Sequence, residues 1–552
     1  MSITIRIRDK SRDFSPGTPL SDALKELFPD EYRSIYACLA GGRLLELTSL
    51  LTEDAVLVPV TYTHEEGRRI YERTLRFVFL MAAEALFPGA RVRIEHSIGY
   101  GIFVRFKGQY LSQDDISALQ KKMEDIIASD LPIRYEKISK EVAYASLISK
   151  GDNDRAELVK KSRETQLPSY VCSGIRDYFY GAMLPSTGWI HAFSLRLVYP
   201  GLTIMMPSPS GWRLPAPFTH RPKNLSAFSQ SIQWCDIMNI NNASDLNRLI
   251  QIGQFRDLVR VNEALHDKSM SEIADSIMQS KAKAIFVAGP SSSGKTTFSN
   301  RLAIHLRVLG FRPVLVSLDN FYRNREDVPL DNDGNPDLEA LDALDVPYLN
   351  ECIGLLLTGQ TAMIPRYSFK TRMREEKSDP VALGQDQLII FKGIHALNPV
   401  FHIGFDPALL CRIYISELTC INIDDHNRIR TTDARLLRRL VRDHAFRASP
   451  AKETLDMWPS VRAGEEKWIF PYQENVDHVF NSVLHYELPV IKPYAEEVLS
   501  QIGPEDPQYL VARRLLDILN CFDTVPRDLL NEIPPLSLLR EFIGGCTFYT
   551  EN

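Results

Sequence analysis

A turn rich in glycine and serine, with one lysine, is the stretch of this chain best equipped for chemistry. Gly289, four further residues and then Gly294–Thr296 fit the pattern G-x-x-x-x-G-K-[ST], which is typical of loops that hold phosphates. Glycines allow the backbone to turn tightly, so successive N–H groups can face one anion. Lys295 would reach the β- and γ-phosphates, and the Thr296 hydroxyl would bind Mg²⁺. The phosphate contacts that we expect come from Gly289, Ser291, Ser292, Ser293, Gly294, Lys295, Thr296 and Thr297.

The segments on either side of this loop have the character that the pattern requires. Ala284–Ala288 is a short apolar run, typical of a buried parallel strand. Residues 298–309 place apolar side chains at helical spacing. The alternative is a chance lysine in a flexible turn, but the flanking strand and helix favour phosphate binding. We therefore expect the chain to bind a nucleoside triphosphate, ATP, together with Mg²⁺.

Length and composition describe an ordinary globular protein. The 552 residues allow about three or four domains. A formal net charge of −6 argues against a protein that mainly coats nucleic acid. The eight scattered cysteines indicate reduced thiols, and no apolar run approaches the length of a membrane span. These features predict a cytoplasmic protein that does not contact a membrane.

The first 62 residues predict a small ubiquitin-like domain. Residues 2–8 alternate apolar and polar side chains as a half-buried strand does, and a short helix is expected over 19–27. Further strands are expected near 43–48 and 55–60. This order resembles the TGS domain found at the front of threonyl-tRNA synthetases and of some regulatory GTPases.

Residues 63–210 resemble the second additional domain, or editing domain, of threonyl-tRNA synthetases. The similar stretches are Ala82–Ala90, Gly101–Phe106, Met123–Pro132 and Cys172–Gly188. Editing in that family requires histidines and a cysteine around one pocket. At the histidine positions this sequence has Arg73, Phe77 and Arg176, and only Cys172 remains. The resemblance implies an α+β editing-like fold without its hydrolytic site.

The front part could also contact RNA. Four arginines, Arg68, Arg69, Arg73 and Arg76, share one helical stretch and could face a ligand. A solvated helix face is the alternative. Residues 211–283 then begin with a proline-rich linker and continue as a helical connection, with helical structure expected over 243–280.

A second apolar strand, Arg312–Ser317, leads to Asp319. Its carboxylate would lie at the edge of a parallel sheet where ligands bind. From here the sequence resembles the uridine kinase and phosphoribulokinase family of P-loop kinases, over about residues 285–490. The resemblance implies that Asp319 accepts the proton of an attacking 5′-hydroxyl. The alternative is that Asp319 caps the following turn.

Further motifs of that family imply a substrate site. Tyr322 follows Asp319, and Tyr367 lies in the segment that brackets the base. Glu339 takes the place of the ribose-binding acid; alternatively, this stretch is the acidic, solvated start of a helix at Asp337. Arg372 stands where the family offers a histidine. The substrate contacts implied are Tyr322, Glu339, Tyr367 and Arg372.

One position departs from the family in a way that concerns the metal. Gln387–Leu397 follows the family pattern, but the glutamate that helps to hold Mg²⁺ is replaced by Lys392. A lysine repels Mg²⁺, although it could contact a phosphate. If the metal binds, Asp319 or another carboxylate must supply the missing ligand.

Residues 433–443 resemble the lid helix of the family. Arg435, Arg438, Arg439 and Arg442 lie on one helical face, which suits the charge of a transferring phosphoryl group. We assign catalysis to Lys295, Asp319, Arg439 and Arg442, and ATP binding also to Arg447. A solvated basic helix is the alternative. The amphipathic tail, residues 501–552, is expected to pack on the body or on a subunit partner, and we expect a homo-oligomer.

The leading hypothesis is an ATP-dependent nucleoside kinase that acts on the 5′-hydroxyl of a uridine- or cytidine-like substrate. It predicts a doubly wound parallel-sheet P-loop domain over 284–500, preceded by a β-grasp domain and an editing-like domain. The alternative is a nucleotide-binding regulatory protein, associated with RNA or the ribosome, whose kinase site is degenerate. Asp319 favours the enzyme, whereas Lys392 and the synthetase-like front favour the alternative.

Overall fold

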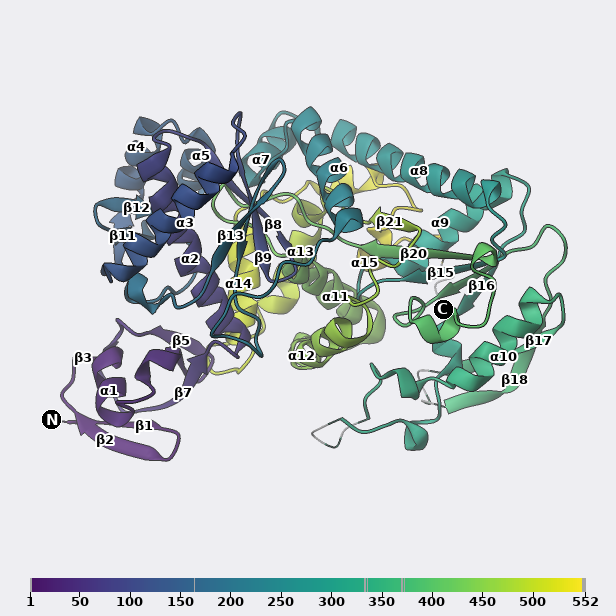
Figure 1. Ribbon diagram of the computed structural model, residues 1–552, viewed down its shortest axis with the longest axis horizontal. Helices are drawn as coiled ribbons and strands as arrows, with labels where there is room; N and C mark the ends of the chain where they lie inside the picture. Colours follow the sequence, from purple (N-terminus) through teal and green to yellow (C-terminus); the bar gives the residue numbers. More distant parts are fainter. Residues whose placement is uncertain are drawn as a thin grey trace.

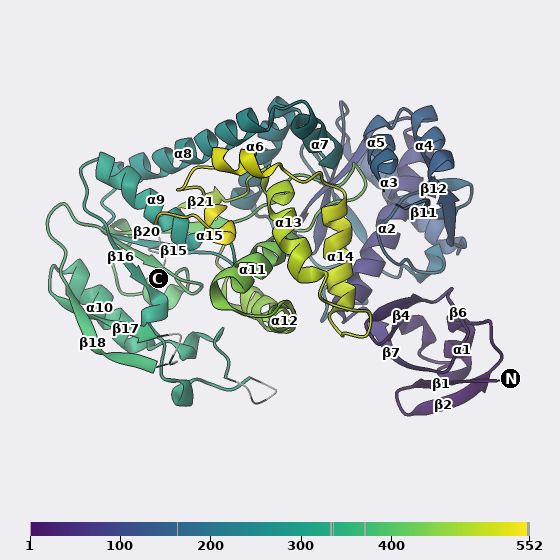
Figure 2. The ribbon, with the colours of Figure 1, turned by 180° about the vertical axis from the view of Figure 1, so that it is seen from behind.

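The computed structural model describes residues 2–162, 164–331, 334, 336–368, 371 and 373–548. Two N-terminal units lie at one end of an elongated molecule and a parallel sheet lies at the other, as Figure 1 shows. C-terminal helices fill the space between them (Figure 2). Within the described part of the chain, no helix is both long enough and apolar enough to cross a membrane.

The first unit is a β-grasp. Its mixed sheet has the order β2-β1-β7-β4-β5, in which β1 pairs antiparallel with β2 and parallel with β7. Alternate residues of β1 are buried, as the sequence pattern predicts. Helix α1 packs its apolar face on the sheet. The elements are β1 Ile3–Ile7, β2 Lys10–Phe14, β3 Thr18–Pro19, α1 Leu20–Leu27, β4 Ile35–Ala40, β5 Arg43–Glu46, β6 Leu50–Leu51 and β7 Ala55–Thr61.

The second unit is α+β and is built on one long helix, α2 (Glu65–Leu86), which is buried along most of its length. A four-stranded sheet of order β13-β14-β9-β8 and a three-stranded sheet of order β10-β11-β12 surround it. The other elements are β8 Val92–Ile98, β9 Gly101–Phe106, α3 Gln113–Ala128, β10 Arg134–Ser139, α4 Lys140–Ser149, α5 Asn153–Lys161, β11 Gln166–Cys172, β12 Ile175–Asp177, β13 Ser194–Val198 and β14 Gly201–Met205.

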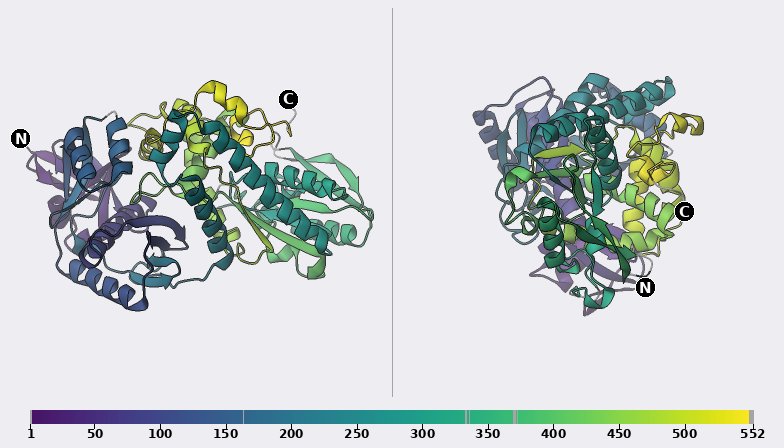
Figure 3. Two further views of the ribbon diagram at one scale, coloured as in Figure 1. Left: turned by 90° about the horizontal axis from the view of Figure 1, so that it is seen from above. Right: turned by 90° about the vertical axis from the view of Figure 1, so that its right-hand side faces the viewer.

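Three helices connect the front units to the sheet: α6 (Pro222–Met238), α7 (Ala243–Gln251) and α8 (Phe255–Gln279). The helical structure expected over 243–280 is present as two helices, because the chain breaks between α7 and α8. Gly253 adopts a φ of +76° there, a conformation that ends a helix and that glycine adopts without strain. Helix α8 runs along one side of the molecule, as Figure 3 shows.

The C-terminal half contains a five-stranded sheet of order β16-β19-β15-β20-β21, all parallel. Side chains of β15 alternate between two cores: Ile285 and Val287 face one, and Ala284 and Phe286 face the other. A parallel sheet covered on both faces confirms the doubly wound prediction. The strands are β15 Ala284–Ala288, β16 Val314–Ser317, β19 Ile389–Lys392, β20 Leu410–Ser416 and β21 His478–Asn481, with an antiparallel hairpin β17 Ala362–Ser368 and β18 Met373–Val381.

Helices of this half carry or cover the site, and the tail returns to it. They are α9 Lys295–Val308, α10 Val346–Leu357, α11 Thr431–Arg447, α12 Ala451–Trp468, α13 Glu487–Leu499, α14 Tyr509–Asn520 and α15 Arg540–Ile543. Of the two alternatives for the tail, this structure has it on the body, since Ile533, Leu538 and Phe542 are fully buried in the core beside α9.

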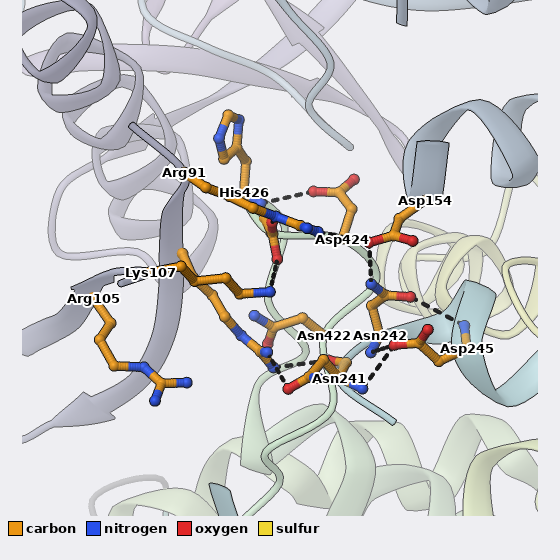
Figure 4. Close-up of polar contacts among 12 residues, drawn as sticks. Arg91, Arg105, Lys107, Asp154, Asn241, Asn242, Asp245, Asn422, Asp424 and His426 are labelled. Atoms are coloured by element: carbon orange, nitrogen blue, oxygen red, sulfur yellow. Dashed lines mark hydrogen bonds and ion pairs between the residues drawn. The ribbon is translucent and has the colours of Figure 1, made fainter. Parts of the chain in front are cut away.

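The two halves are joined through the segment between β20 and α11. The Ile94 N–H donates to the Asp425 carbonyl (2.8 Å) and the side-chain amide of Asn422 donates to the Ile94 carbonyl (2.6 Å), so this segment is hydrogen-bonded to β8 at the edge of its sheet. Arg91 pairs with Asp425 at 2.5 Å. Figure 4 shows this polar cluster, in which side chains of the front units converge on the segment. Because α11 follows directly, the front units hold one end of the helix that carries the predicted lid arginines.

Candidate active site

The glycine loop lies where the carboxyl ends of β15 and its neighbouring strands meet. Gly289 runs so close to β20 that a Cβ there would lie 1.9 Å from the Ile415 carbonyl oxygen. Gly294 adopts a φ of +85°, which favours glycine, and begins α9. The loop therefore has the strand–turn–helix geometry that its motif requires, with the positive end of α9 at the loop.

Lys295 is turned back onto its own loop. Its Nζ donates to the carbonyl oxygens of Gly289 (2.7 Å) and Pro290 (2.9 Å). Burial lowers the pKa of Lys295 to about 8, although the nearby carboxylates of Asp319, Glu541 and Glu465 act in the opposite direction. The ammonium group thus binds two carbonyl groups of the loop, and the Asp319 carboxylate is close enough to raise the pKa of Lys295.

The arginines of α11 share a face but have different partners. Arg439 donates to the Ser291 hydroxyl at 2.9 Å, which brings one predicted catalytic arginine to the loop. Arg435 and Arg438 are each 1% exposed and form buried ion pairs with Glu465 and Glu487. They also donate to loop carbonyls, Arg435 to Ser291 and Arg438 to Ser292. These two arginines therefore stabilise the conformation of the loop through its carbonyl groups.

The other two predicted arginines are less engaged with the loop. Arg442 donates to Asp443, at 2.9 and 2.7 Å. The Arg447 side chain is 57% exposed and lies 3.5 Å from the same carboxylate. The solvated-helix alternative is wrong for α11 as a whole, since Arg435, Arg438 and Arg439 are buried.

The predicted base lies at the end of β16. Asp319 belongs to a short 3₁₀ turn, Leu318–Phe321, and its carboxylate accepts a hydrogen bond from the Ser317 hydroxyl (3.0 Å). That turn has no side-chain cap, so the alternative in which Asp319 serves as a cap is wrong. Half-buried beside the loop, the carboxylate is placed to accept a proton from a bound hydroxyl group.

Three predicted substrate residues gather near Asp319. The rings of Tyr322 and Tyr367 lie 5.5 Å apart, and the Tyr322 hydroxyl donates to the Leu338 carbonyl at 3.0 Å. Glu339 packs under α12, where burial raises its pKa to about 7 against the opposing charge of Arg439. The alternative of a helix that starts at Asp337 is wrong, since a short 3₁₀ turn comes first at Leu341–Ala343 and α10 begins at Val346. Arg372 lies outside the described residues.

Sequence reasoning missed Arg374, which organises this side of the site. Its guanidinium donates to the carbonyls of Phe321 and Tyr322, both at 2.9 Å, and pairs with Asp345 at 3.1 Å. The β17–β18 hairpin is thereby tied to the segment that follows Asp319. A single arginine in a charged strand gives no sequence signal for this role.

Lys392 occupies the position that the metal would need. Its Nζ donates to the Thr296 hydroxyl at 3.1 Å. That hydroxyl is the ligand expected for Mg²⁺, and it already accepts a hydrogen bond from a protein cation, whose charge would repel the metal. Across the described residues, no group of three or more His, Cys, Asp or Glu side chains could hold a metal ion. The residues at this position do not fit a magnesium site.

Two carboxylates that the motifs did not reveal accept hydrogen bonds from the loop region. The Ser291 N–H donates to Glu465 at 3.0 Å, and the Thr297 N–H donates to Glu541 at 3.2 Å. Glu465 lies on α12 and Glu541 on α15, far away in the sequence. Anions thus lie at N–H groups that the motif assigns to phosphate, and an ammonium lies at the metal position.

The residues predicted for the editing-like pocket are engaged in contacts within the second unit. Arg73 donates to the Ala182 carbonyl, Phe77 packs on Phe179 with ring centres 5.6 Å apart, and Arg176 pairs with Glu136 at 2.7 Å. Cys172 is 1% exposed, and burial raises the pKa of its thiol. Each of these residues thus has its own partner within the second unit.

Both alternatives for the arginine stretch of α2 are wrong at three of its four positions. Arg69, Arg73 and Arg76 are buried, and two of them contact the C-terminal half. Arg69 pairs with Asp433 of α11 at 2.9 Å, and Arg76 donates to the His426 carbonyl at 2.9 Å. The three arginines are shielded from solvent, and two of them, Arg69 and Arg76, join the two halves of the protein.

Comparison with known proteins divides the chain in the same way. Residues 284–488 match the model of the Phosphoribulokinase / Uridine kinase family. Among curated proteins, the chain is 27% identical over 186 residues to a threonine–tRNA ligase of Symbiobacterium thermophilum, covering 33% of this chain and 29% of the ligase. A threonine–tRNA ligase of Caldanaerobacter subterraneus subsp. tengcongensis is 28% identical over 197 residues, covering 35% of this chain and 30% of the ligase.

Among solved structures, a chain described as "Structure of a Possible Uridine Kinase from Bacillus stearothermophilus" aligns with 16% identity and a TM-score of 0.28, covering 39% of this chain and 98% of the other. The chain spans about 29% of the length of the first ligase that it matches.

Residues 284–488 thus match the phosphoribulokinase and uridine kinase family of P-loop kinases. The front part resembles threonine–tRNA ligases. The family implies the use of ATP and Mg²⁺.

Proposed function

We propose that this protein is an ATP-dependent nucleoside kinase, with a uridine- or cytidine-like substrate phosphorylated at its 5′-hydroxyl. The observation that carries the proposal is the position of Asp319, at the end of β16 and within electrostatic reach of Lys295. Tyr322, Tyr367 and Glu339 lie on the same side of the loop and offer a stacking surface and a hydrogen-bond acceptor for a nucleoside.

In this reaction the 5′-oxygen forms a bond to the γ-phosphorus as the bond to the β-phosphate oxygen breaks, and ADP leaves. Asp319 takes the proton of the attacking hydroxyl. Lys295 and Arg439 neutralise charge that develops on the transferred group, because both lie at the loop. For this, Lys295 exchanges the Gly289 and Pro290 carbonyls for phosphate oxygens.

A screen of nucleosides for ADP release with ATP as the donor tests the proposal. Asp319→Asn should lower kcat by about 10²–10⁴-fold, the range expected for loss of a positioned base. Asp342→Asn, an exposed carboxylate of the same region, is the matched control and should leave kcat unchanged. A wild-type protein that phosphorylates none of the common nucleosides, with ATP or GTP as the donor, would overturn the proposal.

Lys392 favours a second candidate, a nucleotide-binding regulatory protein that associates with RNA or the ribosome. If the ammonium has replaced the metal for good, ATP should bind nearly as well in EDTA as in Mg²⁺, and no nucleoside should be phosphorylated. Lys392→Glu should then make ATP binding depend on Mg²⁺, because the carboxylate and the Thr296 hydroxyl would both face the ion. Magnesium-dependent turnover by the wild-type protein would exclude this candidate.

A further inference from the structure

The C-terminal tail lies directly on the phosphate loop. Leu538 contacts Gly294 so closely that a Cβ on the glycine would lie 2.4 Å from the leucine Cδ2 atom. Phe542 is fully buried, with the Arg438 guanidinium of α11 5.2 Å from its ring centre. The tail is therefore anchored by packing on both sides of the loop, and its polar residues are held in fixed positions.

Between these two anchors, the Glu541 carboxylate lies at the first turn of α9. One of its oxygens accepts hydrogen bonds from the Thr297 hydroxyl (2.7 Å) and from the Thr297 N–H (3.2 Å). N–H groups at the start of a helix have no partner within the helix and attract anions. In a loop of this pattern they receive the α- and β-phosphates of a nucleotide.

The same carboxylate also acts on Lys295. Burial dominates the pKa of Lys295, and Glu541 is one of three carboxylates whose charge opposes that effect. An anion from the tail thus interacts with the two features on which phosphate binding depends, the helix N-terminus and the loop lysine. A phosphate group and this carboxylate would repel each other if both were present.

We propose that Glu541 is an autoinhibitory residue, whose carboxylate must leave the first turn of α9 before the phosphates of a nucleotide can bind. The inference rests on the proposed function, since it concerns the nucleotide side of the same site. The apparent affinity for nucleotide is then reduced by the fraction of molecules in which the carboxylate is in place.

The geometry allows this release without unfolding the tail. Helix α15 comprises only Arg540–Ile543, and it ends at Gly544 and Gly545, with φ of +91° and +75°. Leu538 and Phe542 supply the packing, whereas Glu541 supplies the charge. Rotation of one side chain therefore clears the N–H group, and a substitution that removes only the charge leaves the anchors intact.

The test compares the affinity of the full-length wild type and of Glu541→Gln for ATP, ADP and adenosine by calorimetry. Glu541→Gln should bind ATP and ADP about tenfold more tightly, the change expected from removing one competing charged hydrogen bond. Its affinity for adenosine, which has no phosphate, should not change. Glu505→Gln makes the same chemical change at an exposed position and should behave as the wild type.

Glu541→Asp provides a second measurement, because it keeps the charge but shortens its reach by one methylene; its affinity for ATP should lie between the other two. Equal ATP affinities for all the Glu541 variants and the wild type would overturn autoinhibition, while the proposed kinase would stand if nucleosides are still phosphorylated. Tighter ATP binding by Glu541→Gln without nucleoside phosphorylation would support autoinhibition and count against the nucleoside kinase. Failure of every variant to bind ATP would overturn both.

Discussion

The phosphate loop and the editing-like pocket are both occupied by the protein itself, but by different kinds of contact. At the loop, the occupants are three charged side chains, Lys392, Glu465 and Glu541, each held by hydrogen bonds to groups that keep the geometry of their motif. In the front pocket, Arg73 and Phe77 replace the expected residues and are buried in the interior.

This difference indicates which of the two sites can still bind a ligand. A charged side chain at a helix N-terminus can exchange with another anion, because only a few hydrogen bonds change. A buried phenylalanine or a paired guanidinium cannot leave without creating a cavity or an unpaired charge. The loop is therefore a site in a closed state, whereas Phe77 and Cys172 of the pocket have become part of the core of the second unit.

The largest effect is expected when the loop lysine is removed. Lys295→Ala should lower kcat/KM for phosphoryl transfer by about 10²–10³-fold, because a donor that stabilises transition-state charge is lost. A coupled assay for ADP release measures this, with circular dichroism to verify folding. Lys281→Ala, at an exposed position just before β15, is the control. Full activity of Lys295→Ala would mean that the loop is not the catalytic site.

Arg69→Ala tests whether the front unit has become structural. Arg69 and Asp433 are 5% and 3% exposed and link α2 to α11, so removing the arginine leaves the buried carboxylate with Arg514 as its remaining guanidinium partner. We expect a loss of about 2–4 kcal/mol in the free energy of unfolding, measured with urea. Arg12→Ala breaks an exposed ion pair with Glu26 and should cost only about 0–1 kcal/mol. Equal effects of the two changes would contradict a structural role for the interface.

The contribution of Glu339 to the stability of the protein should depend on pH. Burial raises its pKa to about 7, above the ordinary value of 4.5, and among its charged neighbours Arg439 and Lys295 oppose the shift while Glu465 and Asp337 add to it. The folded protein then keeps a proton that the unfolded chain has lost, so the contribution of this group to stability falls as the pH rises from about 4.5 through 7.

Glu339→Gln, which is neutral at every pH, should therefore match the wild type near pH 4 and exceed its unfolding free energy by about 1–2 kcal/mol at pH 8. Urea unfolding at the two pH values measures the difference. A stability gap that does not change with pH would show that Glu339 titrates normally.

The smallest effect is expected in the front pocket. Cys172→Ala should change neither ATP turnover nor hydrolysis of mischarged tRNA, which we expect to be absent in the wild type. The thiol is buried, and its raised pKa disfavours the reactive thiolate. Deacylation by the wild type that disappears in this variant would show that the pocket has kept its chemistry.

The elements that depend on short-range sequence patterns could be predicted from the sequence. The glycine loop, the strand before it and the helix after it follow from short-range patterns. The parallel sheet does so too, because every residue of β15 is apolar and its side chains alternate between the cores on the two faces of the sheet. The position of Asp319 at the end of β16 follows for the same reason.

The contacts of the residues in the site could be seen only in the tertiary structure. Four arginines at helical spacing look equivalent in the sequence, but Arg435 and Arg438 pair with buried glutamates from other elements while Arg439 reaches the loop. Glu541 lies 244 positions from Thr297 and still accepts its hydrogen bond. Pairing across such distances depends on how the whole chain packs, because no local pattern records which charge a buried group will meet.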